Sequence, residues 1–263
     1  GIGGMESLEA ELDRARDLDV ADLADAIVEI GFECTRCGAC CKAENCEDER
    51  SESSKRRAES DANREHGGSE DGADTSADAD PHTATVFPDE IRRLQDAGDY
   101  DFRDVARPMP YGLEDGPEGQ EGETFEWALQ TDACGDCTFY EEREASETPH
   151  GDDGTGACTV HEDRPLICRT YPFSVALGGT SQPMGEAVDE QGMVRAHECE
   201  GLGRDISRAE AEDLAAALKE RAIREIEEAI GVRDEYEPVE TGPGEVVVHD
   251  SEGQKRPDGT RLE

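Results

Sequence analysis

The stretch Cys34-Thr-Arg-Cys37-Gly-Ala-Cys40-Cys41 decides how this chain of 263 residues folds. Steps of three residues let a looping backbone present several thiolates to one centre, and Gly38 relieves the tight turn that this spacing requires. Such spacing is typical of ligands to zinc and to iron–sulfur clusters. Because adjacent side chains rarely converge on one metal, Cys41 is a candidate ligand of a second centre.

Six further cysteines follow this stretch and extend the set of candidate ligands. Cys134-Gly-Asp-Cys137 has the spacing of a metal knuckle. The other four are Cys46, Cys158, Cys168 and Cys199. Ten cysteines are enough for two sites of four thiolates with two left over, since long gaps between ligands are harmless when the fold brings them together.

The charge of the chain is extreme: 26 Lys and Arg against 67 Asp and Glu give a formal net charge of −41. A surface this anionic repels nucleic-acid phosphates and anionic lipids, so we expect neither as a partner. The acidic residues are spread along the whole chain, which favours a folded protein adapted to a salt-rich cytoplasm, typical of a halophilic archaeon, where screening weakens self-repulsion.

One long window interrupts the acidic pattern. Residues 164–185 contain no Asp or Glu, and they surround Cys168. A cluster of thiolates is anionic and needs cations or donors nearby, so this window is where we expect the metal chemistry. Arg164 and Arg169 are interpreted as partners of the cluster or of a carboxylate, with an anionic substrate as the alternative.

The sequence also bears on where the protein works. It has no basic and apolar N-terminal signal stretch, and no run approaches the ~18 apolar residues of a membrane span. We therefore expect a cytoplasmic protein that does not enter a membrane. In a reducing cytoplasm, thiols are metal ligands more often than they are structural disulfides.

Hydrophobic periodicity predicts an α+β fold: a small, irregular, metal-organised domain with helices at both ends and a few short strands. The predicted segments are a helical segment over 5–31, a cysteine-cluster domain over 32–205 with a disordered acidic insertion over 47–80, a C-terminal helix over 206–231 and a flexible acidic tail over 232–263. Predicted smaller elements are strands at 83–87, 125–129 and 173–177, a helix at 89–95, and polar loops at 112–123 and 141–157.

Several blocks of residues are similar to a known family. They are Phe32-x-Cys34-x-x-Cys37-Gly-x-Cys40-Cys41, Cys137-Thr-Phe139, Cys158-Thr-Val-His161-Glu-Asp-Arg164-Pro165-Leu-Ile-Cys168-Arg169-Thr-Tyr171-Pro172-Phe173 and Cys199-x-Gly201-x-Gly203. Together they resemble the CxxCxxCC family, also called the YkgJ-like cysteine cluster family, a zinc- or iron-chelating domain. The resemblance implies eight metal-binding cysteines, which are Cys34, Cys37, Cys40, Cys41, Cys137, Cys158, Cys168 and Cys199.

The chain departs from the family pattern at a few positions. Cys46 and Cys134 are extra, and either could replace a ligand or stay idle. His161 stands where the family usually has Tyr. Because mixed Cys and His sites are common for zinc, His161 and His197 are possible ligands, although a position outside the ligand set is the simpler interpretation.

The resulting hypothesis is a metal-binding protein with one or two centres held by thiolates. We favour an iron–sulfur cluster over zinc, because three closely spaced cysteines and a basic, apolar surrounding suit such a cluster, whereas structural zinc usually takes two separated pairs. One alternative is an iron–sulfur oxidoreductase or electron-transfer protein with an unidentified redox partner. The other is a structural zinc module for protein contacts, and no catalytic residue is assigned.

Overall fold

The structure is a computed structural model that describes residues 7–43, 82–142, 156–177, 187–189 and 192–262. The acidic insertion predicted over 47–80 lies outside these residues, as does most of the loop predicted over 141–157. The described part is a mixture of helices and short strands, so the predicted α+β class is confirmed.

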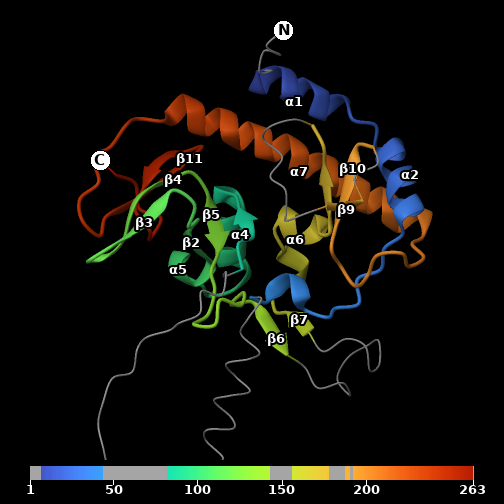
Figure 1. Ribbon diagram of the computed structural model, residues 1–263, viewed down its shortest axis with the longest axis horizontal. Helices are drawn as coiled ribbons and strands as arrows, with labels where there is room; N and C mark the ends of the chain where they lie inside the picture. Colours follow the sequence, from blue (N-terminus) through green and yellow to red (C-terminus); the bar gives the residue numbers. More distant parts are fainter. Residues whose placement is uncertain (1–6, 44–81, 143–155, 178–186, 190–191, 263) are drawn as a thin grey trace, which may run out of the picture.

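Three helices form a layer along one side of the molecule (Figure 1). They are α1 (Leu8–Asp17), α2 (Val20–Ile30) and the long α7 (Arg208–Glu235). Each begins at a polar cap: the side chains of Ser7, Asp19 and Ser207 accept backbone N–H groups of the first turn. The helical segment predicted over 5–31 thus consists of two helices, and the C-terminal helix predicted over 206–231 is α7, which continues to Glu235. None of the helices in the described residues is long and apolar enough to cross a membrane.

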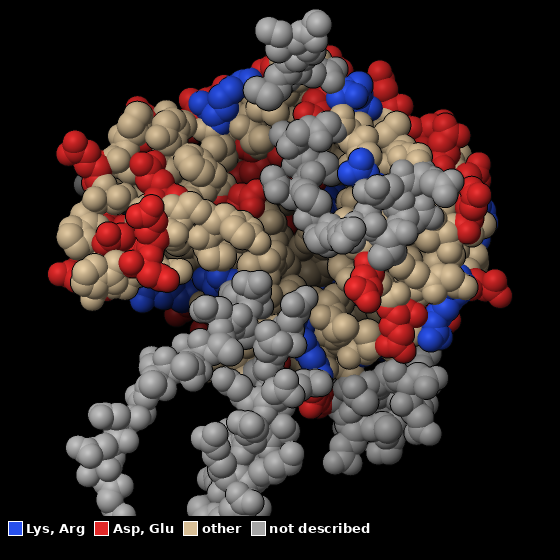
Figure 2. Space-filling model, in the orientation of Figure 1, with Lys and Arg blue, Asp and Glu red and all other residues tan. Residues whose placement is uncertain are grey.

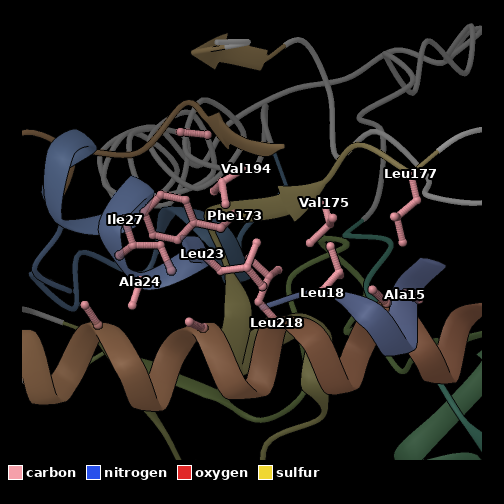
Figure 3. Close-up of a cluster of buried hydrophobic side chains, with 14 of the residues drawn as sticks. Ala15, Leu18, Leu23, Ala24, Ile27, Phe173, Val175, Leu177, Val194 and Leu218 are labelled. Atoms are coloured by element: carbon pink, nitrogen blue, oxygen red, sulfur yellow. The ribbon is translucent and has the colours of Figure 1, made fainter. Parts of the chain in front are cut away.

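The helical layer packs on a three-stranded sheet, which has the order β8–β10–β9. Its strands are β8 (Phe173–Val175), β9 (Ala187–Asp189) and β10 (Val194–His197). Figure 3 shows Phe173 and Val175 directed at Ile27 and Leu218 between the sheet and α7. The Phe32 ring meets Phe173 edge-on at 5.5 Å between centroids, so the first cysteine stretch starts from this core.

A second hydrophobic core lies under the other half of α7. It is formed by a sheet of order β1–β5–β2 and by two short helices. These elements are β1 (Thr85–Val86), α4 (Pro88–Ala97), α5 (Phe102–Val105), β2 (Ala106–Pro108) and β5 (Trp127–Leu129). The indole of Trp127 donates to the buried Asp250 carboxylate at 2.8 Å, which ties this core to the C-terminal strands.

The remaining elements are two sheets and three short helical turns. The four-stranded sheet β12–β11–β4–β3 contains β3 (Leu113–Gly116), β4 (Gly119–Thr124), β11 (Val246–Asp250) and β12 (Gly253–Lys255). The rest are η1 (Ala39–Cys41), the hairpin of β6 (Tyr140–Glu142) and β7 (Gly156–Cys158), η4 (His161–Asp163) and α6 (Leu166–Thr170).

The structure corrects three of the predicted elements. The expected loop over 112–123 is the hairpin of β3 and β4, whose residues are nearly all polar or glycine and therefore show no apolar alternation. Phe125 is 45% exposed and lies outside the strand predicted for it. The expected flexible tail over 232–263 forms β11 and β12, because β11 pairs in parallel with β4 and buries Val247 and Val248.

We predict that Leu218→Ala destabilises the protein by about 2–4 kcal/mol, because Leu218 is 1% exposed between α7 and the β8–β10–β9 sheet and its loss leaves a cavity. Urea unfolding followed by circular dichroism measures the change. The matched control is Val28→Ala on α2, where the side chain is 43% exposed and about 0.5 kcal/mol or less is expected. Equal losses in the two variants would contradict this core.

Candidate metal centre

All eight cysteines predicted as metal ligands are free thiols in the structure, and they come from five separate stretches of chain. Six of them line one cavity of about 930 Å³: Cys34, Cys40, Cys41, Cys137, Cys158 and Cys168. Among the described residues, no three Cys, His, Asp or Glu side chains already surround a common point as metal ligands. The fold thus gathers the thiols around one space without fixing a coordination geometry.

The first cysteine stretch is shaped by two residues with positive φ. Arg36 has φ of 59°, and Gly38 has φ of 80° immediately before η1. A Cβ on Gly38 would lie 2.4 Å from the Tyr140 ring, so both the conformation and the contact favour glycine. The turn places the Sγ atoms of Cys40 and Cys41 3.9 Å apart.

Backbone hydrogen bonds bring two downstream cysteines to this stretch. The N–H of Cys137 donates to the Cys41 carbonyl at 2.8 Å. The N–H of Gly156, at the start of β7, donates to the Arg36 carbonyl at 3.0 Å, and β7 ends at Cys158. These bonds are independent of side-chain identity, so they hold the thiols together even before a metal binds.

The Cys199 stretch is joined to residues 32–33, directly before the first cysteine stretch. The N–H of Glu33 donates to the Gly201 carbonyl at 3.0 Å, and Phe32 forms an isolated bridge with Leu202. A Cβ on Gly201 would lie 2.3 Å from the Glu33 carbonyl oxygen, so only glycine allows this approach. The Gly201 N–H in turn donates to the Cys199 Sγ at 3.4 Å, which helps to orient that thiol.

Cys168 lies on α6, and a buried glutamate fixes the start of that helix. Glu90 on α4 is 1% exposed and accepts the Leu166 N–H at 2.8 Å and the Phe87 N–H at 3.1 Å. Burial raises the pKa of the Glu90 carboxyl. Glu90 was missed in the sequence analysis, although its place three residues after Phe87, with Pro88 between them, is the pattern of a helix cap.

Tyr171 connects α6 to the Cys199 stretch. Its hydroxyl donates to the Glu198 carbonyl, and the His197 N–H donates to the Pro172 carbonyl at 2.9 Å. Burial, and then the charge of Cys199, raises the pKa of the Tyr171 hydroxyl to about 12. Tyr171 therefore positions the segment before Cys199 and stays protonated at neutral pH.

Five of the eight thiols, those of Cys40, Cys137, Cys158, Cys168 and Cys199, have a raised pKa and are hard to ionise. Burial raises the pKa of the Cys137 thiol to about 12 and raises the pKa of Cys158 and Cys199 as well. The hydrogen bond with Cys41 is the largest cause of the raised pKa of Cys40. The Arg164 guanidinium opposes these effects at Cys40 and Cys158, since a nearby cation favours the thiolate.

Electrostatic interactions link seven of the thiols in two groups of four, and Cys40 belongs to both groups. In the first, Cys137, Cys40 and Cys158 all raise the pKa of the Cys168 thiol, after burial. In the second, Cys37, Cys40 and Cys34 raise the pKa of the Cys199 thiol, again after burial. Each group offers four sulfur atoms, the number that a tetrathiolate metal site needs.

The other candidates fall into separate places. Cys46 lies outside the described residues, and Cys134 is disulfide-bonded, so it is not among the free thiols. His161 lines the cavity, and burial lowers its pKa. His197 is 2% exposed and shares a hydrogen bond of 2.9 Å with Ser174, which places it inside the helical core. Arg169 is exposed to solvent.

The aromatic side chains of Tyr171, Phe173 and Trp127 have different positions relative to the cavity. Trp127 is buried and lines the cavity, whereas Phe173 lies within the helical core. Tyr171 also lines the cavity, so Trp127 and Tyr171 both form part of the wall around the thiols. Trp127 stands on β5, in the second core.

Residues 33–200 match the sequence pattern of CxxCxxCC, a family described as a putative zinc- or iron-chelating domain. The chain belongs to the CxxCxxCC family. The matched range contains all eight free cysteines, so metal binding through cysteine is the property that the family description gives to this part of the chain. No curated protein and no solved structure matches the chain.

We predict that Gly201→Ala in this CxxCxxCC domain weakens metal binding and lowers the free energy of unfolding by about 1–3 kcal/mol, because the added Cβ would collide with the Glu33 carbonyl. Metal content after dialysis and urea unfolding are the measurements. Gly242→Ala is the control, since its Cβ would meet only the flexible Glu245 carboxylate at 3.6 Å. A Gly201 variant with full metal content and stability would refute this contact.

A second prediction concerns the metal-free, reduced protein, whose stability should fall as the pH rises from 8 to 10. An unfolded cysteine loses its proton near ~8.5, whereas the folded Cys137 holds it to about 12, so this contribution is present at low pH and lost at high pH. Urea unfolding at several pH values should show a loss of about 1–2 kcal/mol from this thiol. Cys137→Ala should have a shallower pH dependence, and a stability that rises over this range would contradict the burial.

Proposed function

We propose that this domain binds metal through the eight free thiols, in two centres built by the two groups that share Cys40. The observation that supports this most is that six thiols from four separate stretches line one cavity, with the Arg164 guanidinium close enough to favour the ionisation of Cys40, Cys158 and Cys168. Buried thiols resist ionisation, and a bound metal cation favours the thiolate form. Cys40 can bind in only one of the two groups. Cys41, whose Sγ lies 3.9 Å from the Cys40 Sγ, would be the fourth ligand of the other group.

We favour iron–sulfur clusters over zinc. The steps of three residues in the first stretch, the cationic Arg164 and the apolar cavity wall all suit a buried anionic cluster. Such a cluster would supply electron transfer, and its redox partner is not identified. The open space beside the thiols argues against the alternative of a structural zinc module, because structural zinc sites are closed.

The acidic surface supports the proposed setting in a salt-rich cytoplasm. Figure 2 shows groups of Asp and Glu on both sides of the visible face of the described residues, with fewer Lys and Arg. Such a surface is soluble at high ionic strength and repels phosphate-rich partners. We therefore propose a metal protein that meets neither nucleic acid nor an anionic membrane.

The test is to purify the full chain anaerobically in high salt, record its visible spectrum and assay iron, sulfide and zinc. We expect a coloured protein with iron and sulfide in similar amounts. A colourless, zinc-loaded protein would overturn the choice of iron–sulfur. A metal-free protein whose thiols all react would overturn metal binding itself.

The ligand assignment has its own test. Cys168→Ser and Cys37→Ser each remove one sulfur from a different group, so each should lose about half of the bound metal or more, and part of its stability. Cys134→Ser is the control, because Cys134 is not among the free thiols, and it should retain its metal. Full metal content in both ligand variants would refute the assignment.

A further inference from the structure

The cavity beside the cysteines extends well beyond them. Its volume of about 930 Å³ lies within the range of small-molecule sites, which is ~300–1,000 Å³. Much of its wall away from the thiols is apolar, formed by Val86, Phe87, Met109, Trp127, Leu129 and Ile167. Figure 2 shows the face hollowed near its centre, below the position of α7 in Figure 1.

The cysteine end of the cavity carries two guanidinium groups. Arg36 and Arg164 both line it. The positive charges of both guanidinium groups help to lower the pKa of His161, after burial. The Arg164 Nε donates to the His161 carbonyl at 2.9 Å, which fixes that side chain at the wall. In the described part of the chain, neither guanidinium forms an ion pair with a carboxylate, although the protein has 67 acidic residues.

The other end of the cavity is acidic. Glu225 and Glu228 on α7 face Glu126, and their charges add to burial in raising the pKa of the Glu126 carboxyl. Among the residues that the structure describes, Glu225 is the one of the three with a cation at hydrogen-bond distance, the Arg221 Nε at 2.6 Å. Figure 1 shows α7 on the opposite side of the molecule from η1 and β7, which carry cysteines. The cavity therefore has two guanidinium groups beside the thiols and three carboxyl groups beside α7, one of them paired with Arg221.

We propose that the cavity binds a small organic acid: a carboxylate on an apolar body. The carboxylate pairs with Arg36 and Arg164 beside the thiols, and the apolar body lies against Trp127 and Phe87. The three glutamates at the α7 end repel the carboxylate, so they set this orientation. The inference builds on the proposed function, because the carboxylate lies beside the proposed metal centres, but the binding itself depends only on the cavity.

A competing role for the two arginines is to neutralise the thiolates alone. That role explains the two cations, but it does not explain the apolar wall or the large volume of the cavity. A guanidinium pairs a carboxylate through two parallel hydrogen bonds, and a partly buried pair of this kind is worth more than a solvent-exposed one. The combination of unpaired cations, apolar wall and volume matches an amphipathic anion.

The test uses Trp127, the one tryptophan of the chain, as a reporter inside the cavity. The probe is anthracene-9-carboxylate, whose absorption overlaps tryptophan emission, and its neutral match is the 9-carboxamide. We expect saturable, one-to-one quenching of Trp127 by the carboxylate and about 10-fold weaker binding of the carboxamide. Octanoate should displace the probe, and octanol should not.

Variants separate the guanidinium contribution from general apolar binding. Arg36→Gln and Arg164→Gln should each weaken carboxylate binding about 10-fold and leave the carboxamide unchanged, while Arg164→Lys recovers part of the loss. Arg103→Gln is the control, since Arg103 pairs with Asp258 at 3.8 Å and does not line the cavity. Circular dichroism spectra verify that each variant is folded.

The outcomes distinguish this inference from the proposed function. Absence of Trp127 quenching by the carboxylate, or equal affinity in all arginine variants, overturns the organic-acid site. So does a loss of metal in the arginine variants with probe binding unchanged, because the cations then serve the thiolates alone. A metal-free protein that still binds the probe would overturn the proposed function and support the cavity, whereas a metal-loaded protein without probe binding would do the reverse.

Discussion

Five separate stretches of backbone have to meet before the thiols of this chain can share a metal. The meeting is enforced by main-chain hydrogen bonds, above all those from Cys137 to Cys41, from Gly156 to Arg36 and from Glu33 to Gly201. Main-chain groups are buried at little cost only when they are paired, so these contacts constrain the loops more strongly than any one side chain. The cores on either side hold the ends of the stretches in place.

The same arrangement makes the buried thiols difficult to ionise. Thiols that are buried close together resist ionisation, while the cations needed to relieve this are scarce in a chain with 26 Lys and Arg. Arg164 is placed where its charge counts most, in the window of sequence without acidic residues. The acidic exterior and the less acidic surroundings of the site therefore come from different parts of the sequence.

The sequence was informative where a pattern is local. Cysteine spacing indicated that the thiols of Cys34–Cys41 would lie together, and hydrophobic periodicity indicated helices at both ends of the chain. It was silent where pairing is long-range: β11 is a strand only because β4 lies beside it, and the β3–β4 hairpin is too polar to show apolar alternation. Glu90 acts between α4 and α6, a contact that no local signal specifies in full.

The long helix α7 lies outside the range matched by the family pattern, and this affects how the protein can be divided. The family pattern ends at residue 200, yet α7 and the two N-terminal helices supply most of the partners of Phe173, Val175 and Val194. A fragment trimmed to the matched range would leave that sheet face bare to water. The folding unit is accordingly larger than the matched range, and the helices on either side of that range complete its hydrophobic core.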